Sequence, residues 1–349
     1  MKATIYDIAK EAGVSIATVS KVINAKGKIS QEKRSEIIAI MDRLNYQPSV
    51  IASALTGKHT YTLGLLIPDI ANPFFAEVAR AVEQRGHELG YSVIICGTDN
   101  RNERIEQYIS VLRQKQVDGI IIGTGVGDTS MLRDNAWSIP TVMIGREAYA
   151  GTIAHTVVSD DRQGGRDAAE HLLGLGHRRM AVLSESLEIS SSRERLRGFR
   201  ERLDEQGIEL PLDHVRQCKY RVEDGRRQAR ELLALPERPT ALFCCNDLLA
   251  IGALQAAKEA GISIPQELSV VSFDNTILAS VTDPPLTSIA QPVEKLGATA
   301  VELLLREFRE RQSQPQRAQT AAQGAQPQRI ALQTELIIRS STAAPRSRR

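Results

Sequence analysis

The chain has 349 residues, of which 42% are apolar and 25% are charged, and its formal net charge is only +2. This composition is typical of a soluble globular protein, and the length predicts two or three domains. The positive charge is concentrated at one end, because the first sixty residues carry nine Lys/Arg and five Asp/Glu while the remainder comes to −2. A contact with nucleic acid is therefore expected within those sixty residues.

The sequence shows no sign of export or of a membrane anchor. The N-terminus lacks the apolar stretch of a secretory signal and no run of 18 apolar residues occurs, so we expect a cytoplasmic protein. Cys96, Cys218, Cys244 and Cys245 lack CxxC spacing and are expected to be buried, reduced thiols. On a strand, the adjacent Cys244 and Cys245 would point to opposite faces.

Residues 4–44 predict three short helices. Thr4 and Asp7 have the spacing of a capping box at the start of the first helix. Ser15 is a suitable N-cap for a second helix over 16–24. A tight turn between two short helices is the geometry of a helix-turn-helix motif.

The second of these helices has two distinct faces. Val19, Val22 and Ile23 share one side and are expected to pack inward. On the other side, Ile16 can meet a thymine methyl group and Lys21 can reach guanine or a phosphate. A three-helix bundle without a nucleic-acid role remains the alternative at this point. Within the segment 1–48, the residues expected to contact DNA are Thr4, Tyr6, Ser15, Ile16, Ala17, Thr18, Ser20, Lys21 and Asn24.

From residue 61 onward, short apolar runs alternate with longer amphipathic segments. The runs expected to be strands are 63–67, 92–96, 118–122, 141–144, 180–184, 241–245 and 269–273. The segments expected to be helices are 75–89, 102–115, 162–173, 192–206 and 247–260. Such alternation predicts parallel sheets covered by helices on both faces. Because the series is too long for one sheet of ordinary size, we expect two α/β lobes with a ligand cleft between them.

The last forty residues contain two segments of a different composition. Residues 311–329 are rich in Gln, Ala and Pro, which predicts a flexible insertion. Strand-like sequence resumes over 330–338, so the insertion interrupts a domain. Residues 341–349 are expected to form a disordered basic tail.

Signatures of catalysis and of cofactor binding are weak. GTGVG at 123–127 follows a predicted strand, but its third glycine is misplaced for a dinucleotide-binding loop. We find no Walker A, HExxH or GxSxG motif and no Cys/His spacing suited to a metal. We therefore expect no cofactor, no metal and no enzymatic activity.

Several motifs, in order, resemble the LacI/GalR family of transcription regulators. They are TIYDIAKEAGVSIATVSKVIN and KRSEIIAIMDRLNYQPS near the N-terminus, and then LGLLIPDIANPFFAEV, KQVDGIII, LLGLGHRRMAVL, RPTALFCCNDLLAIG and PPLTSIAQP. The resemblance spans nearly the whole chain. It implies an all-α helix-turn-helix domain over 1–48 and a hinge over 49–60. It further implies an effector-binding and dimerisation domain over 61–340, made of two doubly wound α/β lobes joined by three crossovers, as in periplasmic sugar-binding proteins.

The resemblance also assigns a role to the hinge. In this family a short hinge helix forms on operator DNA and inserts leucines into the minor groove. Leu55 matches that leucine, and Ser53 and Ala54 belong to the same predicted contact set. Ser49 and Ser53 replace the Asn and Arg that are usual in the family, and an ordinary Ala/Ser linker remains the alternative.

The effector cleft is the second site implied by the resemblance. The positions that match the family's ligand contacts are Asn72, Phe74, Phe75, Arg146, Asp160, Arg193, Arg195, Tyr220, Asn246, Asp274 and Gln291. Carboxylates, amides and guanidinium groups pair with vicinal hydroxyls, and aromatic faces cover the apolar side of a pyranose. These residue types therefore suit a small sugar or sugar derivative.

The function predicted from the sequence is that of a transcriptional repressor controlled by such an effector. One helix-turn-helix reads too few base pairs to be selective, so a homodimer on a palindromic operator is expected. Operator binding would associate the protein with the nucleoid. The alternative is a sugar-binding receptor with no role on DNA.

Overall fold

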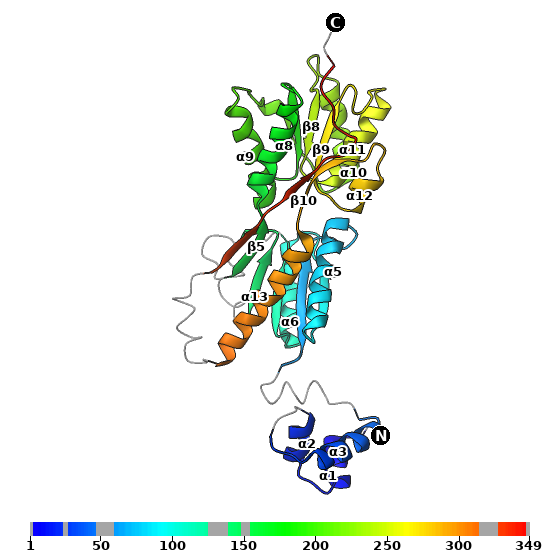
Figure 1. Ribbon diagram of the computed structural model, residues 1–349, viewed down its shortest axis with the longest axis vertical. Coiled ribbons are helices and arrows are strands. Elements are labelled where there is room, and N and C mark those ends of the chain that lie inside the picture. The colour runs from blue at the N-terminus through cyan, green and yellow to red at the C-terminus, as the bar shows by residue number, and fades with distance from the viewer. Residues whose placement is uncertain are drawn as a thin grey trace. The chain divides into compact units, whose positions relative to one another are not determined.

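The computed structural model describes residues 3–23, 27–46, 59–124, 139–147, 154–313 and 327–346. The chain divides into two compact units, Met1–Thr60 and Tyr61–Arg349 (Figure 1). Within the described ranges, none of the helices has the length and apolar character needed to cross a membrane.

The first unit has the three predicted helices. The Asp7 carboxylate accepts hydrogen bonds from the backbone N–H of Thr4 at 2.8 Å and from its hydroxyl at 2.7 Å, which confirms a paired cap at the first helix. The Ser15 hydroxyl accepts from the Thr18 N–H at 3.2 Å and so caps the second. The helices are α1 (Ile5–Glu11), α2 (Ile16–Ile23) and α3 (Gln31–Arg43). Their shared core contains Ile8, Ala9, Ala12, Val19, Val22, Ile37 and Ile40.

The second unit contains two six-stranded sheets, which agrees with the prediction of two lobes with parallel sheets, although the strands at 155–159, 215–217 and 287–290 were not predicted. The first has the order β11 (Arg329–Leu332), β5 (His155–Ser159), β4 (Thr141–Ile144), β3 (Gly119–Ile122), β1 (Thr62–Ile67) and β2 (Ser92–Gly97), with all neighbours parallel. The second has the order β12 (Glu335–Ile337), β10 (Thr287–Ala290), β9 (Ser269–Asp274), β8 (Ala241–Cys244), β6 (Met180–Ser184) and β7 (Val215–Gln217). Its strands are parallel except for β12, which pairs antiparallel with β10.

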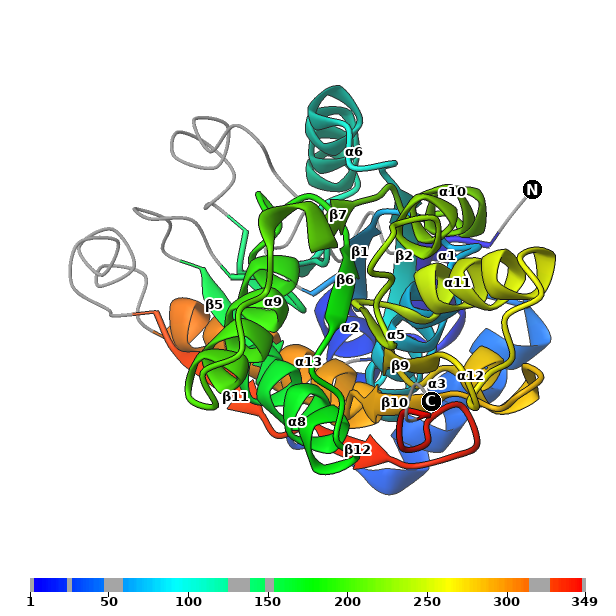
Figure 2. The same cartoon turned by 90° about the horizontal axis from the view of Figure 1, so that it is seen from above.

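Helices cover both faces of each sheet and define two lobes. The first sheet packs on α5 (Pro73–Glu88), α6 (Asn102–Gln114) and α13 (Val293–Ser313). The second packs on α8 (Asp161–Gly174) and α9 (Ser190–Asp204) on one side, and on α10 (Val222–Leu233) and α11 (Asp247–Glu259) on the other (Figure 2). The short α12 (Ile277–Val281) and the 3-10 turn η2 (Leu212–His214) complete this lobe.

The two faces of the second sheet carry separate cores, and the adjacent residues Cys244 and Cys245 show this separation. Cys244 belongs to the core cluster under α10 and α11, whereas Cys245 belongs to the cluster under α8 and α9. Both thiols are free and fully buried. The prediction that neighbouring cysteines point to opposite faces is therefore confirmed.

The chain passes between the lobes at three places. These are the junctions from β5 to α8, from β10 to α13 and from β11 to β12. In each case the preceding and following elements belong to different lobes. The side chains at these junctions consequently lie where the two lobes meet, which decides the position of the candidate site.

The structure corrects two expectations about the C-terminal region. Helix α13 extends to Ser313 and β11 begins at Arg329, so the ends of the expected insertion 311–329 are regular structure. Residues 314–326 lie outside the described residues. The expected disordered tail is wrong for its first part, because Ser341 is fully buried.

Hydrogen bonds to the second sheet explain the order of this C-terminal segment. The Ser341 hydroxyl accepts from the Thr287 N–H at 2.8 Å and donates to the Val270 carbonyl. The Ala343 N–H donates to the Ser269 hydroxyl at 3.0 Å. The sequence looked hydrophilic because the small polar side chains there serve buried backbone groups rather than solvent. Residues 347–349 lie outside the described residues.

The close packing of α8 against α9 generates a stability prediction. A Cβ atom at Gly198 would lie 1.9 Å from the Arg162 carbonyl oxygen, a backbone atom that cannot turn aside. We expect Gly198→Ala to lower the unfolding free energy by about 2 kcal/mol or more in urea titrations followed by circular dichroism. The matched control is Gly174→Ala, because a Cβ there meets nothing within 4 Å. Equal stability of the two variants would contradict this packing.

Candidate functional site

The exposed face of α2 is the candidate nucleic-acid interface. Val19 and Val22 are buried against the other two helices, and Ile23 packs partly against the same core. Ile16 is 39% exposed although it is a large apolar residue, and Lys21, five residues further along the helix, is also exposed. The predicted division of this helix into a packing face and an outward face is confirmed.

The remaining predicted DNA contacts in the first unit differ in how available they are. Tyr6 is 68% exposed and Ala17 is exposed. Thr4 is exposed, but its hydroxyl donates to Asp7. The hydroxyls of Ser15 and Thr18 lie 2.9 Å apart, so each has a local partner as well as an open side. Ser20 is half-buried, and Asn24, Ser53, Ala54 and Leu55 lie outside the described residues.

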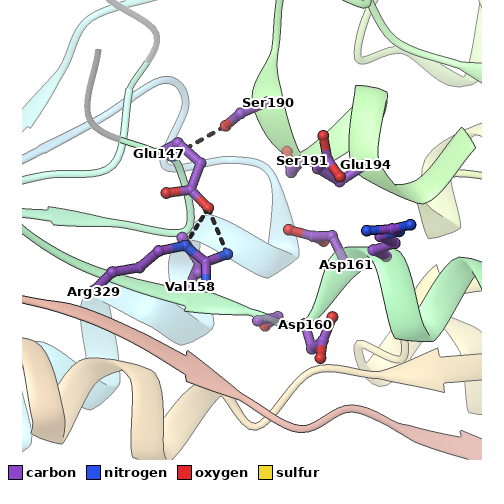
Figure 3. Close-up of a pocket in the computed structure, with 10 residues that line it drawn as sticks. Glu147, Val158, Asp160, Asp161, Ser190, Ser191, Glu194 and Arg329 are labelled. Carbon is purple, nitrogen blue, oxygen red and sulfur yellow. Dashed lines mark hydrogen bonds and ion pairs between the residues drawn. The ribbon is translucent and has the colours of Figure 1, made fainter. Parts of the chain in front are cut away.

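A cleft between the two lobes of the second unit is the candidate ligand site. Its wider part is a pocket of about 360 Å³ and its narrower part holds about 20 Å³. The two parts share Ser191 and are lined by the consecutive residues Arg146 and Glu147, so they form one cleft. The Glu147 N–H, from the first lobe, donates to the Ser190 hydroxyl of the second at 3.0 Å (Figure 3).

The narrow part brings together most of the residues predicted to bind an effector. They are Asn72, Phe74, Phe75, Arg146, Arg195, Tyr220 and Asp274. The Arg146 guanidinium donates to the Tyr220 hydroxyl at 3.2 Å, and the Phe75 ring meets the Tyr220 ring edge-on with centroids 6.3 Å apart. Because these contacts join the lobes, the narrow part has room for about one water.

Tyr220 is also a titratable group in an apolar setting. Burial raises the pKa of its phenol to about 12, so the hydroxyl stays protonated at neutral pH. A neutral phenol both donates and accepts hydrogen bonds. Tyr220 can therefore present a hydroxyl and an aromatic edge to a ligand at the same time.

A buried guanidinium organises the second lobe's side of the cleft. The Arg195 Nε donates to Asp161 at 2.7 Å, and its Nη1 lies 3.4 Å from Asp274 and donates to the Cys245 carbonyl. The guanidinium carbon sits 3.7 Å above the centroid of the Phe273 ring. We name the set Asp161, Arg195 and Asp274 the Arg195 cluster.

Charges within the Arg195 cluster determine its protonation behaviour. Burial raises the pKa of both carboxyl groups, Asp161 and Asp274, and the nearby Arg195 lowers it only in part. Burial opposes the charge of Arg195, but its carboxylate neighbours outweigh that effect and raise its pKa further. One cation is therefore shared between two buried acids.

Gln291 connects the Arg195 cluster to two crossovers between the lobes. Its amide nitrogen donates to Asp274 at 2.6 Å, and its amide oxygen accepts from the Ser159 hydroxyl at 2.7 Å. Ser159 ends β5, just before the first crossover, and Gln291 follows β10 at the second. The cluster and the two crossovers are consequently joined in one hydrogen-bonded network.

Asp274 has a backbone conformation that is unusual for its residue type. Its φ of 99° lies in the left-handed region, which costs free energy for any residue except glycine. The following turn is held by Asp247, whose carboxylate accepts from the N–H of Thr276 at 2.7 Å and from its hydroxyl at 2.8 Å. The structure thus fixes the carboxylate of Asp274 toward the cleft.

The other predicted effector residues lie at the edge of the cleft or behind it. Asp160 lines the wide part and caps α8 by accepting from the Gln163 N–H at 3.0 Å. Gln291 and Asn246 contact lining residues without lining either part themselves. Arg193 does not line the cleft: it is on the outer side of α9, 51% exposed, and donates to the Leu187 carbonyl at 3.1 Å.

Several lining residues were missed by sequence reasoning. Glu185, which directly follows β6, is buried and accepts from the Ser192 hydroxyl at 2.6 Å and from the Asn246 amide. Its place at the carboxyl end of a parallel strand was a usable signal. Glu147 pairs with Arg329 at 2.6 Å, and local sequence patterns do not predict a partner that is so distant in the sequence. The further lining residues are Val158, Ser159, Asp161, Arg162, Ser190, Ser191 and Glu194.

A metal centre finds no support in the described part of the chain. No three His, Cys, Asp or Glu side chains there are grouped so that they could hold an ion. The arrangement in the cleft is one of donors, acceptors and aromatic rings, which suits reversible binding of a polar small molecule.

Two protein families match the sequence. The family described as bacterial regulatory proteins, lacI family, matches residues 4–49, and the periplasmic binding protein-like domain matches residues 169–342. The HTH-type transcriptional regulator DegA of Bacillus subtilis (strain 168) is 42% identical over 347 residues, which is 98% of this chain and 99% of the relative.

Solved structures agree with these matches. The lac repressor dimer bound to operator and the anti-inducer ONPF superposes with a TM-score of 0.85 and 28% identity, over 99% of this chain and 100% of the other. A LacI family transcriptional regulator from Enterococcus faecium with bound ribose has a TM-score of 0.70 and 30% identity, over 82% of this chain and 100% of the other.

The Arg195 cluster generates a prediction about stability and pH. Arg195→Met leaves two carboxyl groups buried without their cation, which costs about 3–5 kcal/mol. Because their pKa is higher folded than unfolded, the unfolded state binds fewer protons, and stability falls as pH rises through the folded pKa. We expect the loss in thermal stability caused by Arg195→Met to be larger at about pH 7.5 than at about pH 5.

The matched control for this variant is Arg197→Met on the same helix. Its side chain is 56% exposed and its ion pairs are at the surface, so a small, pH-independent loss is expected. A loss of the same size for both arginines would show that the buried charges do not have the role described.

Proposed function

The chain belongs to the lacI family of bacterial regulatory proteins, and we propose that it represses transcription by binding a palindromic operator as a homodimer under the control of a small sugar-like effector. It is a DNA-binding transcription regulator and not an enzyme. Such a regulator works in the cytoplasm, where association with the nucleoid would follow from operator binding. The observation that carries the proposal is the pairing of an outward-facing α2 with an inter-lobe cleft in one chain.

The DNA contacts are proposed from the exposure of α2. Ile16 and Lys21 are the outward residues with enough reach for base edges, while Ala17 lets the helix approach closely. The hydroxyl residues Ser15 and Thr18 stand at the N-terminal end of the helix, where contacts to phosphate set the register. The hinge contact of Leu55 is retained as a proposal from the family resemblance.

Two copies of the chain are needed for selective recognition. A single module reads about one half-site, and symmetric dimers match pseudo-palindromic operators. The lac repressor structure similar to this chain is described as a dimer bound to operator. This likeness supports a homodimer here.

The effector is proposed to bind in the cleft. Aromatic rings from Phe74, Phe75 and Tyr220 lie beside guanidinium and carboxylate groups, a combination suited to a ring that bears hydroxyls. The similar regulator from Enterococcus faecium holds ribose. Because the narrow part joins the lobes by direct contacts, a ligand there would alter how the lobes meet. A receptor without a role on DNA would have no use for residues 4–49.

Operator selection tests the proposed function. The full chain is used to select duplexes from random DNA, and the affinity of the selected site is compared with random duplex at one salt concentration. We expect a palindromic site bound at least about a thousandfold more tightly than random DNA. Binding that depends on salt but is indifferent to sequence would overturn the proposal.

Lys21→Ala tests the DNA-reading face. We expect operator affinity in fluorescence anisotropy to fall about tenfold, the loss expected for one good base contact, with binding of the effector unchanged. The matched control is Lys33→Ala, which removes the same charge from α3, where Lys33 pairs with Glu36 at 2.9 Å. Equal losses in the two variants would mean that α2 reads no sequence.

Asp274→Asn tests the cleft, and its expected outcome is the opposite of that for Lys21→Ala: the effector response is lost and DNA binding is kept. The substitution keeps the size of the side chain but removes the charge next to Arg195. Using the sugar or phosphosugar that changes operator affinity most in a panel, we expect that change to disappear while the variant still binds the operator. A variant that responds as the wild type does would place the effector elsewhere.

A further inference from the structure

The wide part of the cleft has an excess of negative charge. Its lining contains four carboxylates and two guanidinium groups, which gives a formal charge of −2. The carboxylates belong to Glu147, Asp160, Asp161 and Glu194, all of which are labelled in Figure 3. The site itself is the cleft of the proposed function, and its charge is what selects the ligand class.

The two guanidinium groups of this lining are already paired with carboxylates of the protein. Arg162 makes a two-point contact with Glu201, at 2.8 and 2.7 Å. Arg329 is paired with one oxygen of Glu147, at 2.8 and 2.6 Å. Neither cation is within ion-pair distance of Asp160, whose described hydrogen bond comes from the neutral Gln163 N–H. Glu194 lies 3.9 Å from Arg193 and 3.8 Å from Arg197, so it also has cationic partners. The negative excess available to a ligand is therefore that of Asp160 and of the two acids, Asp161 and Asp274, that share the single cation of Arg195.

The narrow part does not compensate for this excess. Its two guanidinium groups, Arg146 and Arg195, are balanced by Glu185 and Asp274. Arg195 also serves Asp161, which lines the wide part. Glu185 is 2% exposed, and its described donors, Ser192 and Asn246, are both neutral. Taken together, the lining of the cleft keeps a surplus of carboxylates.

A ligand that enters the cleft must fit this charge. A phosphate or carboxylate group would be brought against carboxylates in a partly dehydrated space, where like charges interact strongly. A neutral sugar would leave the carboxylates as they are. A protonated amine supplies three donors and one positive charge, and forms charge-assisted hydrogen bonds.

We propose that the effector is a polyhydroxylated amine of the amino-sugar class, with its ammonium group bound in the wide part of the cleft by Asp160, Asp161 and Glu147. This inference rests on the proposed function, because it names the ligand of the same cleft. The hydroxyl groups of the ligand face the narrow part, where Arg146, Tyr220 and Asp274 offer donors and acceptors.

Matched sugars test the ligand class. Isothermal titration of the full chain compares glucosamine, glucose, N-acetylglucosamine and glucosamine 6-phosphate, with the same four forms of galactose and mannose. We expect at least one free amine to bind about tenfold or more tightly than its three counterparts, the difference expected for a charge-assisted contact. The proposal is overturned if a neutral, acetylated or phosphorylated form binds as tightly as its amine, or if every amine fails at millimolar concentration.

Asp160→Asn separates charge from structure. Asparagine can still cap α8, so the fold is kept, but the negative charge is lost. We expect the affinity for the best amine to fall about tenfold, with no loss for its N-acetyl form. The control is Asp167→Asn on the same helix, whose carboxylate accepts from the Gln163 amide at 2.8 Å and does not line the cleft. Equal losses in the two variants would overturn the assignment of the ammonium group.

Operator binding by the same preparation distinguishes a failure of the proposed function from a failure of the amine inference. If no operator is selected, the proposed function fails. If an operator is bound and a neutral sugar or a phosphosugar changes its affinity, the proposed function stands and the amine inference fails. If a free amine changes operator affinity and its N-acetyl form does not, both stand.

Discussion

The buried pairing of Arg195 with Asp161 and Asp274 is the interaction on which the ligand-binding unit depends. Asp161 begins α8 directly after the first crossover, and Asp274 ends β9 next to the strand that leads to the second. Desolvating three charges is costly, and the cost is recovered only when each group has its partners in good geometry. Removing the guanidinium group of Arg195 alone would leave two carboxyl groups buried without a cationic partner.

The same pairing links structure to regulation. Gln291 and Ser159 extend the cluster to two of the three crossovers, so the surface that contacts a ligand also connects the lobes. A ligand can shift a conformational equilibrium only through a difference in affinity for its states, and operator and effector must then affect each other reciprocally. Side chains such as Tyr220 and Arg146, which bond to each other across the cleft, are the contacts that a ligand would replace.

Local patterns in the sequence were sufficient for the reading helix and for most of the elements, but they missed the strands β5, β7 and β10. The spacing of Val19, Val22 and Ile23 identifies the packing face of α2, and the Thr4–Asp7 cap marks the start of α1. The alternation of apolar runs with amphipathic segments predicted two lobes, because each such run is buried on both faces. Resemblance to a family placed eight residues that line the cleft in the structure, seven in its narrow part and Asp160 in its wide part.

The rest of the site depends on contacts between distant residues. Glu147 meets Arg329 across 182 positions, and no periodicity encodes that meeting. Arg193 was assigned to the cleft from the family resemblance, yet Arg193 and Arg195 are two positions apart on a helix and therefore point in different directions. Ser341 was assigned to a disordered tail because hydrophilic composition does not distinguish a solvated serine from one that serves buried backbone.

A double-mutant comparison tests the central claim most directly. Unfolding free energies are measured in urea for Arg195→Met and for Arg195→Met combined with Asp161→Asn. If the buried cation compensates for the buried carboxylates, adding Asp161→Asn to Arg195→Met removes one of the two uncompensated negative charges. The double variant then has a higher unfolding free energy than Arg195→Met alone. A double variant that is less stable by the sum of the separate losses would contradict the account.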